Sequence, residues 1–101
     1  MDAEFQNEAS KVSIRNKINA VQQELDSYEL QNEYIKDIVF DYSKLLKAEE
    51  RKFFLGESSV FLVNFREAKL IESKLKAIEL ENNFLKTKAT LFKAAVISLT
   101  D

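Results

Sequence analysis

The chain has 101 residues, a formal net charge of -2, 46% apolar and 32% charged residues, and neither cysteine nor histidine. Its length admits one small domain, and its apolar fraction is too high for a disordered tail. The two missing residue types exclude a disulfide framework, a cysteine or histidine metal site, and a thiol or imidazole catalytic group. We therefore expect no enzyme activity and no cofactor.

Charge and hydropathy also narrow the choice of partners and location. Acidic and basic residues are interspersed along both halves, and no basic stripe of the kind found in nucleic-acid binders is evident. No apolar run approaches the roughly 18 residues of a membrane span. The N-terminal Met-Asp-Ala-Glu-Phe lacks the apolar core of a signal peptide. We expect a soluble chain without membrane contact of its own, which is either cytosolic or a segment of a longer precursor.

Residues that break helices are almost absent, with no proline and a single glycine, Gly56, close to the middle. Helix-favouring residues are frequent on both sides of it. The sequence predicts a helix over about 9–54, a turn over about 55–58 and a helix over about 59–99, with fraying of the first eight residues. Gly56 is expected in the left-handed conformation that ends a helix, and Ser58 or Ser59 as the cap of the next. The predicted fold of residues 1–101 is all-α, a single long antiparallel coiled-coil helical hairpin turning at Gly56.

Each half carries a stripe of residues at alternating steps of three and four, which is typical of a coiled-coil seam. Ten of the twelve positions in each stripe are apolar or aromatic. The first predicted seam is Ile14, Ile18, Val21, Leu25, Tyr28, Asn32, Ile35, Val39, Tyr42, Leu46, Glu49 and Phe53. The second is Phe61, Asn64, Ala68, Ile71, Leu75, Ile78, Asn82, Leu85, Ala89, Phe92, Val96 and Leu99.

Folding back at Gly56 would set Val39 level with Leu75, Phe53 level with Phe61, and Asn32 level with Asn82. Two buried amides at one level pair with each other and fix the register of the helices. Amides at the edge of the seam reach solvent instead, and the sequence leaves both arrangements open for Asn32 and Asn82.

A second stripe follows the second half, off the predicted seam, and Leu80 and Ala94 widen it. Each helix of a simple hairpin needs only one seam, so the extra stripe predicts a second neighbour rather than a merely apolar surface. Its residues are Val63, Leu70, Ala77, Phe84 and Leu91.

The many charged side chains are best interpreted as solvated faces with ion pairs between neighbouring helix turns. This interpretation covers Glu49, Glu50, Glu67, Glu72, Glu79 and Glu81. The turn differs, because Phe54, Leu62 and Phe65 cannot all be buried by two helices. Exposed aromatics there predict docking of another helical element, with a plug that only seals the turn as the alternative.

The turn and the start of the second helix carry a recognisable motif. It comprises Arg51-Lys52-Phe53-Phe54-Leu55-Gly56-Glu57-Ser58-Ser59, followed by Leu62-Val63-Asn64, Arg66-Glu67, Lys69-Leu70-Ile71 and Lys76. This motif resembles the last periplasmic helical hairpin of TolC-family outer-membrane efflux proteins, in the versions of Bacteroidetes-type bacteria. The resemblance extends over residues 15 to 98, and its specific part over about 51–71.

The resemblance implies a hairpin of a trimeric channel whose helices form a periplasmic α-barrel, each packed against two neighbours. It further implies that a periplasmic adaptor protein docks by its own helical hairpin at the tip, and that drugs or toxins pass through the lumen. The implied docking residues are Phe54, Leu55, Gly56, Glu57, Ser58 and Leu62.

A full family member also has a signal peptide, two repeats and membrane strands, which this chain lacks. We therefore expect an excised segment or a stand-alone relative, which in isolation self-associates. Two other interpretations remain open. One is the adaptor's own periplasmic hairpin, and the other is a coiled-coil scaffold without a role in transport.

Overall fold

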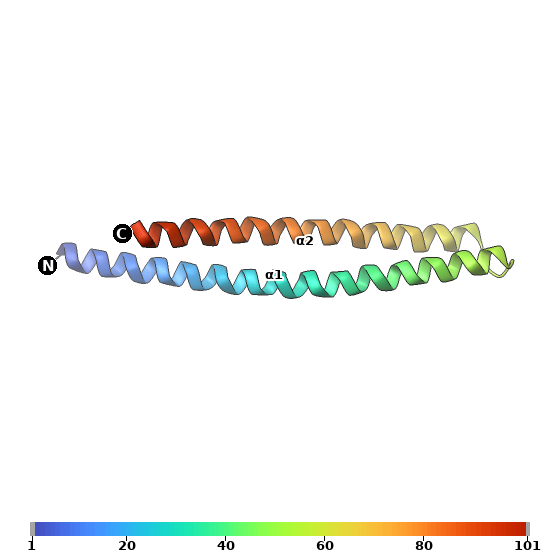
Figure 1. Ribbon diagram of the computed structural model, residues 1–101, viewed down its shortest axis with the longest axis horizontal. Coiled ribbons are helices and arrows are strands. Elements are labelled where there is room, and N and C mark those ends of the chain that lie inside the picture. Colours follow the sequence, from blue (N-terminus) through green and yellow to red (C-terminus); the bar gives the residue numbers. More distant parts are fainter. Residues whose placement is uncertain (1, 101) are drawn as a thin grey trace. The chain divides into compact units, whose positions relative to one another are not determined.

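The computed structural model describes the backbone of residues 2–100 and the side chains of residues 8–99. Helix α1 spans Asp2–Phe54 and helix α2 spans Val60–Thr100, joined by residues 55–59, and the described residues contain no strand (Figure 1). The predicted all-α helical hairpin is confirmed. The second helix agrees with the predicted range within one residue at either end, whereas α1 begins at Asp2 rather than near residue 9.

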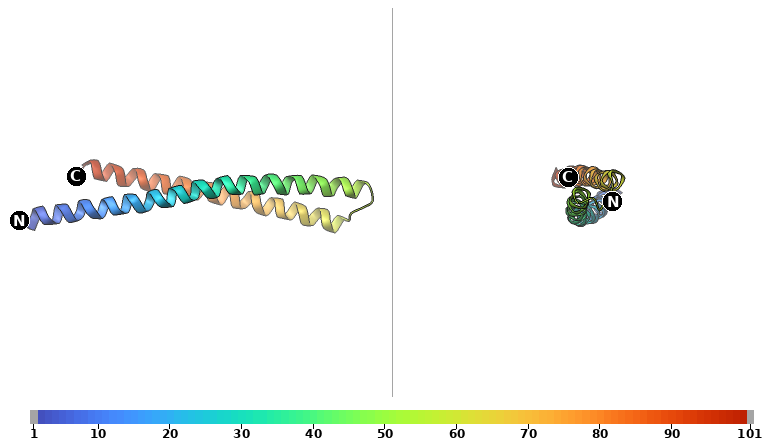
Figure 2. Two further views of the ribbon diagram at one scale, coloured as in Figure 1. Left: turned by 90° about the horizontal axis from the view of Figure 1, so that it is seen from below. Right: turned by 90° about the vertical axis from the view of Figure 1, so that its right-hand side faces the viewer.

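The hairpin divides into two compact units, described here one at a time. The tip unit, residues 30–81, contains the end of α1, the connecting loop and the start of α2 (Figure 2). The terminal unit comprises residues 2–29 of the N-terminal side with residues 82–100 of the C-terminal side. In each unit a stretch of α1 packs against an antiparallel stretch of α2.

The seam predicted for α1 is confirmed in both units. In the tip unit Ile35 and Glu49 are buried, and the seam residues between them are half-buried. In the terminal unit Val21 is buried, and its seam neighbours are again half-buried. Phe53 is the exception at the end of the stripe, since 42% of its surface stays exposed.

The seam predicted for α2 is wrong in both units. Every one of its residues is exposed, from Phe61 to Ile78 in the tip unit and from Asn82 to Leu99 in the terminal unit. The side of α2 that faces α1 contains the stripe predicted for a second neighbour, together with Arg66, Ser73 and Thr87, which were not part of that prediction. Its residues are Val63, Arg66, Leu70, Ser73, Ala77 and Leu80 in the tip unit, and Phe84, Thr87, Leu91 and Ala94 in the terminal unit, all buried or half-buried.

The two stripes of α2 are offset by two residues, which turns a helix by about 200°. They therefore lie on nearly opposite faces, and both carry the spacing of a coiled coil. Because the inward stripe contains polar side chains, the sequence pattern did not identify it as the face that packs on α1. Ser73 is buried because its hydroxyl donates a 2.8 Å hydrogen bond to the carbonyl oxygen of Leu70 in its own helix, which leaves no polar group unsatisfied.

For Asn32 and Asn82 the sequence left open a buried pair and amides that reach solvent. Asn82 is exposed in the terminal unit, whereas Asn32 is half-buried in the tip unit. A buried pair would need both amides in one shielded layer. The cross-helix register in the tip unit is instead marked by Glu49 and Arg66.

Two leucines of the tip unit provide a direct test of the assignment of faces. Leu70 is 9% exposed and Leu75 is 62% exposed. We expect Leu70→Ala to lower the free energy of unfolding by about 2–3 kcal/mol, because it removes buried methyl groups and leaves a cavity. The matched Leu75→Ala variant is expected to lose less than about 0.5 kcal/mol.

The changes in the free energy of unfolding are measured by urea denaturation, monitored by circular dichroism at helical wavelengths. The protein is kept dilute so that contacts between molecules do not contribute to the measured stability. A greater loss for Leu75→Ala than for Leu70→Ala would contradict the observed orientation of α2.

Candidate functional site

The end of α1 is closed by a compact hydrogen-bonded turn. Gly56 has a φ of 76° and donates its N–H to the carbonyl of Phe53 at 3.0 Å, while the N–H of Glu57 reaches the carbonyl of Lys52 at 2.8 Å. These two bonds and the left-handed glycine form a Schellman motif. The left-handed conformation predicted for Gly56 is therefore confirmed. The chain therefore reverses abruptly after Phe54.

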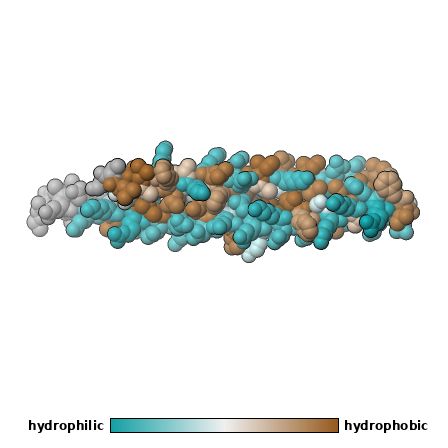
Figure 3. Space-filling model, viewed as in Figure 1, coloured by the Kyte–Doolittle hydropathy of each residue, from teal (hydrophilic) through white to brown (hydrophobic). Residues whose placement is uncertain are grey.

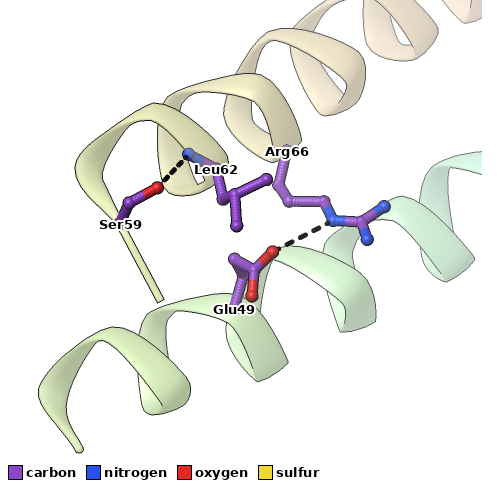
Figure 4. A network of polar contacts seen from close by, with 4 residues as sticks. All are labelled: Glu49, Ser59, Leu62 and Arg66. Carbon is purple, nitrogen blue, oxygen red and sulfur yellow. Dashed lines mark hydrogen bonds and ion pairs between the residues drawn. The ribbon is translucent and has the colours of Figure 1, made fainter. Parts of the chain in front are cut away.

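The start of α2 is capped by Ser59. Its hydroxyl oxygen accepts the N–H of Leu62 at 3.2 Å, and its carbonyl accepts the first helical bond from Val63 at 3.1 Å (Figure 4). Of the two predicted serines, Ser59 is thus the cap. Ser58 is half-buried, and its hydroxyl oxygen has no hydrogen-bond partner.

An ion pair joins the two helices behind the turn. The Nε atom of Arg66 lies 3.7 Å from the Oε1 atom of Glu49, whose side chain is 8% exposed, against 34% for Arg66 (Figure 4). The expectation that Glu49 belongs to a solvated face is wrong, because Glu49 holds a seam position of α1. A buried carboxylate of this kind depends on its partner, since removal of the arginine would leave a buried charge unpaired.

Other charged groups lie on the surface as predicted. Lys69 pairs with Glu72 at 3.6 Å and Lys76 with Glu79 at 3.5 Å, each three residues apart on α2. Exposed pairs like these contribute little to stability.

Apolar side chains surround the turn and are strongly exposed. Phe54 is 87% exposed, Leu55 is 67% exposed, and Leu62 and Phe65 are exposed as well. Phe61, which the sequence sets level with Phe53 in the seam, is 75% exposed. Figure 3 shows brown, hydrophobic atoms at this end of the tip unit, next to teal, hydrophilic ones. We call Phe54, Leu55, Phe61, Leu62 and Phe65 the tip cluster.

The residues expected to bind an adaptor are thus brought together in one unit. The Schellman motif places Phe54 and Leu55 at the end of α1, and Ser59 fixes the first turn of α2 that bears Leu62. Sequence reasoning gave Phe61 a place in the seam, and only its exposure assigns it to the tip cluster.

In each unit α2 also exposes apolar side chains outside the stripe that packs on α1. In the tip unit, the tip outward face comprises Ala68, Ile71, Leu75 and Ile78. In the terminal unit, the terminal outward face comprises Leu85, Ala89, Phe92, Val96 and Leu99. The stripe predicted to contact a second neighbour, Val63, Leu70, Ala77, Phe84 and Leu91, packs on α1 instead. The apolar surface that α2 leaves free for a neighbour consists of the tip outward face and the terminal outward face.

An open groove of about 420 Å³ runs along the tip unit, with Ile35, Ile38, Tyr42 and Leu75 as its apolar lining. Lysine and glutamate side chains of α2 form its charged edge. Among the residues that the structure describes, no acidic cluster could hold a metal ion, and no helix is long and apolar enough to cross a membrane.

Comparison with known proteins found no match among family models, curated proteins or solved structures.

Gly56 is expected to control the geometry of the tip. An added Cβ would meet no atom within 4 Å, so Gly56→Ala tests the left-handed backbone without a steric clash. We expect this variant to lower the free energy of unfolding by about 1–2 kcal/mol, the cost of a left-handed conformation for a residue with a Cβ.

Gly56→Asn is the matched control, because asparagine adopts this conformation more readily and should lose less. Thermal unfolding followed by circular dichroism provides the ranking. Equal stability of the alanine variant and the unaltered chain would contradict a turn held by a left-handed glycine.

Proposed function

We propose that this chain is a periplasmic α-barrel hairpin of an outer-membrane efflux or secretion channel, and that its tip docks a periplasmic adaptor protein. The observation that carries the proposal is the turn itself. The Gly-Glu-x-Ser motif that resembles the TolC family, Gly56 to Ser59, forms a closed turn with Phe54 and Leu55 projecting beside it. An apolar tip on a rigid turn suits recognition by another helical hairpin.

The outward faces of α2 support the same function. A barrel helix packs against neighbours on two sides, and α2 carries an apolar stripe on each of two opposite faces. One stripe packs on α1, which leaves the other for the next helix of the barrel. In this proposal the chain is one part of a longer, trimeric channel protein, and its location is the periplasm.

A cell-fractionation experiment tests the proposal. An antibody raised against this polypeptide is used to probe outer-membrane and soluble fractions of the source cells. We expect a band several-fold larger than 11.7 kDa in the outer-membrane fraction. A band at the mass of this chain in the soluble fraction would refute the channel and leave a stand-alone scaffold.

The docking role of the tip is tested by substitution in the chromosomal gene. We expect Phe54→Ser combined with Leu55→Ser to abolish export of a fluorescent dye at unchanged channel levels, because the exposed side chains contribute to docking and little to folding. The control is Phe40→Ser on α1, which removes a 58% exposed aromatic away from the turn.

Export by cells with the Phe40→Ser channel should equal that of unaltered cells. Full export by the doubly substituted tip would contradict docking there.

A further inference from the structure

The two outward faces differ in the charge of their flanks. The tip outward face is flanked on α2 by four exposed glutamates and one exposed lysine: Glu67, Glu72, Glu79, Glu81 and Lys74. The terminal outward face is flanked by three exposed lysines, Lys86, Lys88 and Lys93, and α2 has no acidic residue from 82 to 100. One face is therefore apolar with an acidic margin, and the other is apolar with a basic margin.

We propose that a second copy of this chain binds through α2 in antiparallel orientation, with the tip outward face of each copy on the terminal outward face of the other. Each copy carries both faces, so the contact is made twice in a two-fold dimer. This inference goes beyond the channel proposal and does not depend on it, because it concerns the chain by itself.

One register matches the apolar layers and the flanking charges on either side of Asn82, which it sets level with Leu85. It sets Leu75 level with Phe92 and Ile78 level with the small Ala89, which follows the pairing of layers in an antiparallel coiled coil. The same register places three pairs of opposite charge beside these layers. The pairs are Glu72 with Lys93, Glu79 with Lys86, and Glu81 with Lys88.

Other arrangements bring like charges together. A shift of one heptad towards the turn sets Glu79 on Glu79 and Lys74 on Lys88, and a shift the other way sets Lys86 on Lys86. A parallel pair would place Glu67 near Glu72 and Lys88 near Lys93, which offset its two pairs of opposite charge, Lys74 with Glu79 and Glu81 with Lys86. Apolar burial supplies the attraction, and the charges select the orientation and the register.

The ion pairs within α2 do not oppose the dimer. Glu72 and Glu79 are more than half exposed in their pairs with Lys69 and Lys76, so their carboxylates remain accessible to the lysines of a second copy. Pairs at the rim of such an interface are screened by salt. Association is expected to weaken as the ionic strength rises.

Charge reversal tests the proposal by sedimentation equilibrium of the whole chain. Lys86→Glu with Lys93→Glu, and separately Glu72→Lys with Glu79→Lys, should each raise the dimer dissociation constant by at least about tenfold. An equimolar mixture of the two variants should restore association, because opposite charges then face each other in both contacts: the unaltered pairs in one and the reversed pairs in the other. Lys44→Glu with Lys47→Glu on the exposed surface of α1 is the matched control and should leave the constant unchanged.

A monomeric unaltered chain at all concentrations would overturn the proposal, as would a mixture that associates no better than its components. The relative orientation of the two α2 helices is measured by disulfide formation between introduced cysteines. The chain has no cysteine of its own that would interfere. Under oxidising conditions, a mixture of Ile78→Cys and Ala89→Cys chains should form the mixed disulfide in preference to either homodimer. Dominant homodimeric disulfides would show a parallel pair and refute the antiparallel contact.

Discussion

A helix in a two-helix hairpin can bury only one of its faces against its partner, and α2 carries two faces with the spacing of a seam. They lie about 200° apart because the stripes are offset by two residues. The packed stripe contains Arg66, Ser73 and Thr87, whereas the exposed one contains Ile71, Leu75 and Phe92. The more apolar face of α2 is thus the one left in solvent. It stays exposed because a single partner helix can cover only one face of α2.

Three features of the tip unit accompany the choice of the inward face: the turn, the helix cap and one ion pair between the helices. The Schellman motif at Gly56 and the Ser59 cap set how α1 ends and how α2 begins. The buried Glu49 then needs a cation, and Arg66 on the inward stripe supplies it at 3.7 Å. Hydrophobic packing alone would favour the other face, so the charged pair contributes specificity as well as contact.

The sequence predicted the all-α hairpin, the seam of α1, the left-handed glycine and the exposed tip, because each depends on local propensity or on one unambiguous stripe. It failed for α2, where two stripes share one period and hydropathy favours the wrong one. A usable signal was present. Glu49 interrupts the seam of α1, so its partner stripe had to contain a basic residue near the turn, and only the stripe of Val63 and Leu70 has one, Arg66.

The exposed faces of α2 connect the two proposals. A neighbouring helix in a barrel and a second copy of the chain would use the same apolar surface, so the two modes of packing exclude each other at any one moment. A neighbour that displaces the second copy must match an acidic margin beside Leu75 and a basic margin beside Phe92. The charge pattern that aligns two copies is therefore also the pattern that a barrel neighbour would have to satisfy with its own charges.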